Sequence, residues 1–355
     1  MSYEIDFLPV GNGDSSGDAI LLRYGNLYGH RDEQIVMVID GGFNDTGKEI
    51  IDFLDLHYKT DRIDLVVSTH PDADHINGLR TVVAELSVGE LWLHIPDQHS
   101  PELAVLRRNG WASGIQLRET LRKDLSAAAE LEQIARDRGI PIVEPFSGVS
   151  HGSQHGQLLV VGPSEEYYEE LLPQFTQFTG RSLVAKAREA LANLVPETMW
   201  IETLTDEGET SPENNSSTIL LLQVAGRSLL LTGDAGMPAL HAAADRLDSA
   251  GFDWSSVRFI QMPHHGSKRN VGPTILDRYL GPKGQGEKHK TAFASTGPGA
   301  TPKHPHKKVT NAFVRRGCLA ANTAGKAICH SQNAPPRDGW GPIEGLPLYP
   351  MVEDD

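Results

Sequence analysis

The stretch Ser68 to Leu79, STHPDADHINGL, contains two histidines and two aspartates within six positions, directly after an apolar run. The preceding IDLVVST is typical of a buried strand, and a helical apolar pattern begins near Ile76, so the polar residues occupy a strand-to-helix turn. Imidazole and carboxylate groups are good ligands for divalent metals, and a pair of ions needs about this many donors. The turn therefore predicts either a solvated charged loop or part of a metal site. Its donors are His70, Asp72, Asp74 and His75.

Three further apolar runs end in ligand-type residues. Asp40 ends IVMVID, Asp234 ends LLLTGD, and the pair His264 and His265 follows FIQMP. A metal site needs ligands from more than one loop, and these strand ends supply the candidates. Together the four strand ends favour a metal site over a charged loop.

The composition limits the class of protein. The 355 residues are 39% apolar and carry a formal net charge of -15, so a sizeable core is expected and a general affinity for nucleic acid or anionic membrane is not. The only two cysteines, Cys318 and Cys329, suit neither a disulfide framework nor a cysteine zinc site. The start MSYEIDFLPV lacks the basic and apolar regions of a secretory leader, and no apolar run approaches 18 residues. We therefore expect a cytoplasmic protein with no membrane partner.

Short apolar runs dominate both halves of the chain, and amphipathic segments with helical spacing lie between them at 48–56, 78–86, 237–247 and 307–316. This order predicts an α+β fold, an αββα sandwich of two mixed sheets flanked by helices; periodicity alone leaves a doubly wound sheet open. Residues 117–138 form a further predicted helix. We expect one domain over 1–331, with a helical and loop insertion at about 164–213, and an extended tail over 332–355.

Several phrases carry a resemblance to a known family: FLPVGNGD, THPDADHINGL, ENNSSTILL, RSLLLTGD, MPHHGS and KHPH. Their order resembles the metallo-β-lactamase fold hydrolases, and more narrowly the hydrolase domain of ComEC-type DNA-uptake proteins, here in a stand-alone soluble form. The resemblance extends from residue 4 to about 330, interrupted at 113–139 and 164–213.

The resemblance implies two divalent ions, with His70 and Asp72 holding one, Asp74 and His75 the other, and Asp234 bridging them. His265 matches the last histidine ligand of the family. His264 would lie behind the ligands or donate a proton, and Asp40 would orient the ligand loop. A hydroxide activated by the metal pair would attack the substrate, held by Asp74 and Asp234.

The chain departs from the common family pattern at two positions. Asp72 stands where most members have histidine, and Asn214 and Asn215 stand where a histidine precedes STILLL. Both changes remove imidazole, which predicts a harder site than a typical dizinc centre, one that prefers Mn²⁺ or Mg²⁺ or binds its second ion weakly. The expected cofactors are two divalent ions, Zn²⁺ or Mn²⁺, with Mg²⁺ as a further candidate.

Basic residues near the predicted metals favour an anionic substrate. The segment 303–316 collects Lys303, His304, His306, Lys307, Lys308, Arg315 and Arg316. Lysine and arginine bind phosphate oxygens, although a solvated helix face would show the same pattern. The predicted substrate-binding residues are Asn215, Ser267, Lys268, Lys303, His304 and His306.

We therefore expect a metallohydrolase, a phosphodiesterase or nuclease acting on nucleic acid or a nucleotide-derived molecule, with a protein partner that directs its activity. The alternatives are a small-molecule ester, lactone or thioester hydrolase with an apolar pocket lined by the 164–213 insertion, and a non-catalytic metal-stabilised module. GDSSG at 13–17 resembles a serine-protease phrase but lacks chain before it for that family's other catalytic residues, so Asp14 and Asp18 are expected only to shape a loop. Four other histidines are weak candidates for the missing imidazole: His94, His99, His151 and His155.

Overall fold

A computed structural model describes the chain except for residues 14, 110–118, 176–192, 286–288, 301–303 and 355. Two seven-stranded sheets form its centre. The first runs β15 (Ile328–Gln332), β1 (Ser2–Phe7), β2 (Ile20–Gly25), β3 (Gln34–Ile39), β4 (Arg62–Val67), β5 (Ser87–Trp92), β6 (Ile142–Val143). The second runs β14 (Cys318–Asn322), β13 (Lys290–Ala294), β12 (Val257–Gln261), β11 (Arg227–Leu231), β10 (Ile219–Val224), β8 (Gly156–Gly162), β7 (Ser150–Ser153). Both are mixed, so the predicted sandwich is confirmed and the doubly wound sheet is excluded.

Alternation along the strands separates three layers of apolar side chains. Leu220 and Leu222 of β10 point into the core between the two sheets, while Ile219 and Leu221 point outward to the helices. Because both faces of these strands are buried, they consist of continuous apolar runs such as ILLL. This is why the strand predictions from apolar runs succeed.

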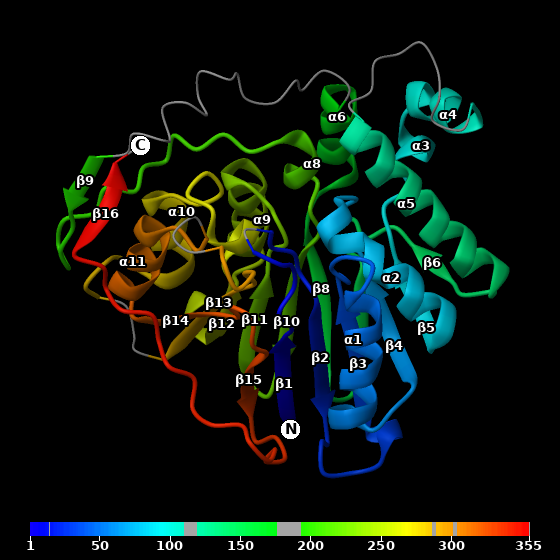
Figure 1. The fold of residues 1–355 in the computed structure, drawn as a ribbon, viewed down its shortest axis with the longest axis horizontal. Helices are drawn as coiled ribbons and strands as arrows, with labels where there is room; N and C mark the ends of the chain where they lie inside the picture. The colour runs from blue at the N-terminus through cyan, green and yellow to red at the C-terminus, as the bar shows by residue number, and fades with distance from the viewer. Residues whose placement is uncertain (14, 110–118, 176–192, 286–288, 301–303, 355) are drawn as a thin grey trace.

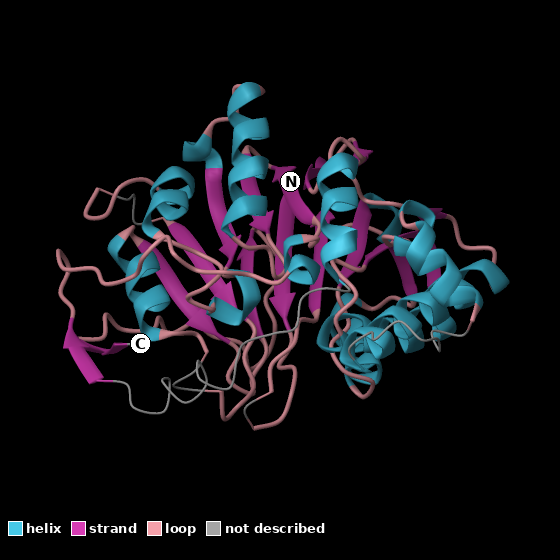
Figure 2. Ribbon diagram, turned by 90° about the horizontal axis from the view of Figure 1, so that it is seen from above, coloured by secondary structure: helices cyan, strands magenta, loops and turns pink. Residues whose placement is uncertain are grey.

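Helices cover the outer face of each sheet (Figures 1 and 2). The first sheet packs against α1 (Thr46–Phe53), α2 (Ala73–Glu85) and α5 (Glu119–Asp137). The second packs against α9 (Met237–Ser249), α10 (Pro273–Leu280) and α11 (Lys307–Arg315). The helices predicted at 48–56, 78–86, 117–138, 237–247 and 307–316 are thereby confirmed, whereas α10 was not predicted.

The insertion at 164–213 contributes α6 (Glu165–Phe175), β9 (Asn193–Pro196) and the start of α8 (Pro212–Asn215). With α3 (Pro96–His99) and α4 (Pro101–Arg108), α6 lies beside α5. Strand β9 pairs with β16 (Met351–Asp354) of the tail, and the two lie at one margin of the molecule (Figure 1). No described helix is both long enough and apolar enough to span a bilayer.

A close backbone contact positions the loop that follows β3. A Cβ atom on Gly78 of α2 would lie 1.9 Å from the carbonyl oxygen of Gly41, so only glycine fits at Gly78. The amide of Gly41 donates to His75 O at 2.6 Å, and the amide of Gly78 donates to Gly42 O at 3.1 Å. This packing holds Asp40, the residue that follows β3, against the start of α2.

Candidate metal centre

The predicted ligands meet at one end of the sandwich, where strands of both sheets end. Asp40 follows β3, His70 follows β4, Asp234 follows β11 and His265 follows β12. The two sheets are joined at this end because the amide of Thr218, just before β10, donates to Thr69 O at 2.9 Å. The structure therefore brings together Asp40, His70, Asp72, Asp74, His75, Asp234, His264 and His265.

Asp40 fixes the orientation of two histidines. Its Oδ1 accepts from the amide of Thr69 at 2.8 Å, and its Oδ2 accepts from Thr69 Oγ1 at 2.7 Å and from His75 Nδ1 at 2.8 Å. Since the Thr69 hydroxyl donates to Asp40, it accepts from His70 Nδ1, which lies 3.0 Å away. Both imidazoles thus keep a proton on Nδ1 and direct Nε2 at the centre, the arrangement found around metal-bound histidines.

Asp234 lies between two groups of donors. Its Oδ1 is 3.4 Å from His75 Nε2, whereas its Oδ2 is 3.8 Å from His70 Nε2 and 3.5 Å from His264 Nε2. Further out, His70 Nε2 is 3.7 Å from Asp72 Oδ2, and His265 Nε2 is 3.7 Å from Asp74 Oδ2. Two oxygens that face different ligand groups suit a carboxylate shared by two ions.

These separations fit a metal centre better than a hydrogen-bond network. Among the described residues of this centre, the buried side-chain atoms without a hydrogen-bond partner include His70 Nε2, His75 Nε2, His265 Nε2 and Asp234 Oδ1. Leaving such atoms unpaired costs about 1–3 kcal/mol each. Two ligands about 2.0–2.2 Å from a tetrahedral ion lie roughly 3.3–3.6 Å apart, close to the spacings seen here. The donor set therefore fits divalent cations.

The charges of the donors depend on one another. Burial raises the pKa of Asp234, but the facing His264 and His75 outweigh burial and hold it well below its ordinary value. Burial acts in the same direction on Asp74, where His265 and His75 prevail and lower the pKa to about 2. Conversely, burial lowers the pKa of His265, and the carboxylates of Asp74 and Asp234 raise it to about 8. A metal must therefore displace protons from the imidazoles, so its binding depends on pH.

Asp18 is a buried member of the centre that the sequence did not reveal as one. Its Oδ1 lies 3.9 Å from His265 Nδ1, and its Oδ2 lies 3.8 Å from His75 Nδ1 and accepts from Gln261 Nε2 at 2.8 Å. Burial raises its pKa against the opposing effect of His265 and His75. The only sequence signal was its place between a glycine-rich loop and β2, which fits loop shaping equally well. Asp14 of the same loop lies outside the described residues.

Asp124 of α5 also approaches the ligand loop. It accepts a hydrogen bond from the amide of Ala73 at the start of α2, and burial together with the charges of Asp72 and Asp74 raises its pKa to about 7. Asp124 lies more than forty residues from the ligand loop in sequence, on a helix whose pattern indicated only packing.

Of the two asparagines that replace the expected histidine, Asn214 faces the centre. Its Nδ2 lies 3.4 Å from Asp234 Oδ2 and 3.0 Å from His264 Nδ1. Asn215, predicted to bind substrate, instead accepts from the amide of Gly236 and donates to Thr210 O. Its amide thus holds the α8 turn to the loop after β11, and a role of Asn215 in substrate binding stays a prediction.

Most of the predicted basic segment stabilises the fold. Arg315 pairs with Glu197 at 2.9 Å, with both side chains 0% exposed, and Arg316 pairs with Glu202 at 2.7 Å. Lys307 pairs with Glu353 at 2.6 Å. These three cations therefore do not support the argument from basic charge to an anionic substrate, because acidic residues of the insertion and tail neutralise them.

The other predicted substrate-binding residues differ in position. His306 caps α11, accepting from the amide of Lys308 at 3.2 Å, and burial followed by the charge of Lys268 lowers its pKa to about 4. Ser267 is buried and accepts from the amide of Arg269 at 3.3 Å. The ring of His304 lies 6.3 Å from the rings of both His264 and His265. Lys268 and His304 thus remain beside the centre, and Lys303 lies outside the described residues.

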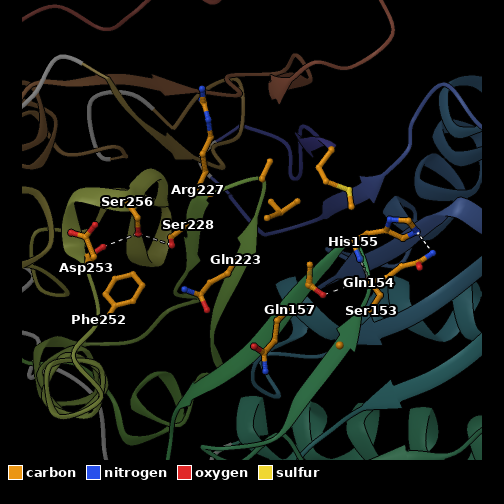
Figure 3. A pocket seen from close by; sticks show the side chains of 16 residues that line it. Ser153, Gln154, His155, Gln157, Gln223, Arg227, Ser228, Phe252, Asp253 and Ser256 are labelled. Atoms are coloured by element: carbon orange, nitrogen blue, oxygen red, sulfur yellow. Dashed lines mark hydrogen bonds between the residues drawn. The ribbon is translucent and has the colours of Figure 1, made fainter.

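The four alternative histidines have other surroundings. His94 is buried between Phe146 and Tyr168, and burial, with the charge of His99 second, lowers its pKa to about 3. His99 contacts three glutamates. His151 and His155 lie on β7 and its turn, at the end of β8 and β10 remote from Asp234. There, His155 lines a pocket of about 840 Å³ with Gln154, Gln223 and Arg227 (Figure 3). This pocket is separate from the metal centre.

Comparisons with known proteins agree with the fold. Residues 16–164 match the family model of the metallo-beta-lactamase superfamily. The match contains Asp18, Asp40 and the HPDADH turn, whereas Asp234 and the two histidines after β12 lie beyond it. No curated protein sequence matches the chain.

Solved structures show weak likeness. CmlA, a diiron beta-hydroxylase from Streptomyces venezuelae, is 12% identical with a TM-score of 0.43, covering 92% of this chain and 54% of CmlA. This chain therefore spans about half the length of that protein. A metallo-beta-lactamase-like protein from Thermotoga maritima is 12% identical with a TM-score of 0.34, and the alignment covers 66% of this chain and 79% of that protein. The MIM-2 metallo-beta-lactamase is 12% identical with a TM-score of 0.35, and the alignment covers 87% of this chain and 88% of that protein. These values are too low to assign an activity.

Proposed function

We propose that this chain, whose residues 16–164 match the metallo-beta-lactamase superfamily model, is a dinuclear metal-dependent hydrolase of phosphodiesters. The observation that carries the proposal is the position of Asp234, whose two oxygens face separate donor groups. Two ions a few ångströms apart, bridged by one carboxylate, are the arrangement that phosphatases and nucleases use to stabilise attacking and leaving oxygens.

The residues that would hold the ions are His70, Asp72, Asp74, His75, Asp234 and His265. When bound, such ions supply Lewis-acid polarisation of the electrophile and a nucleophile at neutral pH. Asp40 keeps the protons of His70 and His75 on Nδ1, so that both Nε2 atoms stay available. The oxygen ligands of Asp72, Asp74 and Asp234 favour the harder cations, so Mn²⁺ is our first candidate beside Zn²⁺.

Two basic side chains beside the centre support an anionic substrate. Lys268 follows the PHHG turn directly and acts electrostatically on His306, and the His304 ring lies near both histidines of that turn. In a chain of net charge -15, the positive charge of Lys268 beside the centre attracts a phosphodiester, and the side chains of Lys268 and His304 can orient it by hydrogen bonds. The ComEC-type resemblance makes nucleic acid, or a molecule derived from nucleotides, our first substrate class, and a directing protein partner remains part of the proposal.

The test is hydrolysis by purified metal-stripped protein after addition of Mn²⁺, Mg²⁺ or Zn²⁺. Substrates are bis(p-nitrophenyl) phosphate, labelled single- and double-stranded DNA, and a panel of p-nitrophenyl esters, lactones and thioesters. We expect metal-dependent cleavage of the phosphodiesters, lost in Asp74→Asn and retained in Asp137→Asn, a solvent-facing carboxylate at the far end of α5. Cleavage of the esters alone would replace the proposal with the ester-hydrolase alternative.

A further inference from the structure

The turn after β12 has an unusual backbone. His264 and His265, within the 3-10 turn Pro263–Gly266, both adopt left-handed conformations, with φ of 49° and 58°. Such a conformation in a residue other than glycine costs on the order of 1–3 kcal/mol and persists only where the surroundings enforce it. Hydrogen bonds from His264 N to Gly233 O and from His306 N to Gly266 O hold the turn in place.

This backbone directs two consecutive imidazoles toward the same centre. His265 Nε2 lies 3.7 Å from Asp74 Oδ2, and His264 Nε2 lies 3.5 Å from Asp234 Oδ2. One ligand atom each of Asp234, His264 and His265 lie within 4.8 Å of one another. In an extended strand, successive side chains would point to opposite sides, so the strained turn is what allows both rings to approach the carboxylates.

A neighbouring asparagine fixes the proton of His264. Asn270 Nδ2 donates to the carbonyl oxygens of Asp234 at 2.8 Å and Ala235 at 3.4 Å, which assigns the amide orientation and leaves Oδ1 facing His264 Nδ1 at 3.2 Å. An oxygen without a proton can only accept, so the His264 proton lies on Nδ1. Asn214 Nδ2 lies 3.0 Å from His264 Nδ1 and 3.4 Å from Asp234 Oδ2. With Nδ1 protonated, either this NH₂ group donates to Asp234 Oδ2 alone, or the amide is turned over so that its oxygen accepts from Nδ1 and its nitrogen donates to Ser211 Oγ, 2.8 Å from the present oxygen position.

The resulting tautomer suits a metal ligand. A neutral His264 with its proton on Nδ1 presents the lone pair of Nε2 toward Asp234 Oδ2, 3.5 Å away. Proton donation from Nε2 would instead need the charged imidazolium, whose Nε2–H and positive charge would occupy the same space as an ion on the Oδ2 side of Asp234. An imidazole whose other nitrogen donates to an amide oxygen is the usual arrangement of metal-bound histidine.

We infer that His264 Nε2 is a metal ligand, binding the ion on the Oδ2 side of Asp234, and that Asn270 is the positioning residue that sets its tautomer. This assignment replaces the expected role of His264 as proton donor. It gives the Oδ2 side a second imidazole beside His70, as His265 accompanies His75 on the other side. Asn214, an amide donor where the resemblance implies imidazole, supplies no nitrogen ligand.

The inference rests on the metal-binding part of the proposed function and is tested without substrate. Metal-stripped full-length protein is titrated with Zn²⁺ against a chromophoric chelator, comparing wild type with His264→Asn. Asparagine tolerates the left-handed backbone but is too short to reach the Nε2 position. The matched control is His155→Asn, which removes an imidazole at the remote end of the sandwich.

We expect His264→Asn to bind one of two ions at least about 100-fold more weakly, since loss of a group that only orients a ligand already costs 10–100-fold. His155→Asn should bind both ions as wild type does. Asn270→Ala should weaken the same ion as His264→Asn, by about 10–100-fold. Wild-type affinity for both ions in His264→Asn, with phosphodiesterase activity lost, would overturn the inference and restore the proton-donor role. Absence of hydrolysis in wild type that binds two ions would instead refute the proposed substrate class alone.

Nitrogen NMR of the zinc-loaded wild-type protein tests the same point in case His264→Asn does not fold. Long-range proton–nitrogen spectra should show His264 protonated on Nδ1, with the Nε2 resonance shifted from its metal-free position. A proton on Nε2 of the zinc-loaded protein would contradict the assignment.

Discussion

Replacing Asp40 with asparagine should impair metal binding although the two side chains have nearly the same shape. The carboxylate accepts three hydrogen bonds, two from Thr69 and one from His75 Nδ1. Asparagine has only one acceptor oxygen. If that oxygen keeps the hydrogen bond from the Thr69 amide, the NH₂ group of the asparagine faces the Thr69 hydroxyl and His75 Nδ1. His75 must then accept at Nδ1 and carry its proton on Nε2, the atom that faces Asp234.

The magnitude follows from this change of tautomer. Loss of a group that orients a ligand costs 10–100-fold in metal affinity, about 1.4–2.7 kcal/mol. In the metal-free protein, loss of hydrogen bonds to a charged group should lower the free energy of unfolding by about 2 kcal/mol. The substitution should leave the backbone conformation unchanged, because Asp40 has a φ of 57° and asparagine is favoured in this left-handed region.

The assay is competitive Zn²⁺ titration together with urea unfolding of the metal-free protein. Asp64→Asn is the matched control, since Asp64 accepts from the amide of Val36 at 2.7 Å and pairs with Arg31 at 2.8 Å, away from the metal centre. That variant should lose stability and keep wild-type metal affinity. Wild-type affinity in Asp40→Asn would refute the argument that Asp40 selects the tautomer.

Three further predictions concern stability and the basic segment. His99→Gln should lower the free energy of unfolding by about 1 kcal/mol in acid, as for other solvent-screened pairs, and less at alkaline pH. Burial lowers the pKa of His99, but the hydrogen bond to Glu144 and the neighbouring glutamates outweigh burial and raise the pKa above 6.5. The stabilisation by His99 is therefore complete below pH 6.5 and is lost as the pH rises through the pKa of the folded protein. Thermal unfolding at acid and alkaline pH measures this difference, and an equal loss of stability at both would contradict the prediction. Chelation of bound metal should lower the unfolding temperature, because each ion present at 100 times its Kd contributes about 2.7 kcal/mol; an unchanged melting curve would argue against metal in the fold. Arg315→Leu should destabilise the protein by about 3–5 kcal/mol in urea unfolding, since it leaves Glu197 buried without its cation. Lys268→Ala should instead reduce turnover of an anionic substrate with little loss of stability. Reduced turnover without loss of stability in Arg315→Leu, together with loss of stability alone in Lys268→Ala, would assign Arg315 to the substrate site.

The sequence predicted which side chains meet at this centre, because their residue types stand where apolar strands end. His70 to His75 form one contiguous turn, and Asp234 and His265 each follow a run whose burial is evident from its composition. The same apolar runs predicted the two-layer fold. Strand β15, ICHSQ, was missed because its polar residues hide the pattern, and β14, CLAAN, was missed because it contains only one large apolar residue.

The orienting residues could not be predicted, because their roles depend on contacts between distant segments. Asp18 is held by Gln261, 243 positions away, and neither residue is distinctive in sequence. Charge alone likewise could not show that Arg315 and Arg316 are neutralised by Glu197 and Glu202 of the insertion. The proposed domain boundary at 331 and the cellular location stay predictions.

The most direct test of the account is the number of metal ions bound by wild type and by Asp234→Asn. Equilibrium dialysis followed by elemental analysis measures it without any substrate. Because both oxygens of Asp234 face separate donor groups, wild type should bind two ions per chain, and the single substitution should weaken both. One ion in wild type, or two tightly bound ions in Asp234→Asn, would contradict a centre built around a shared carboxylate.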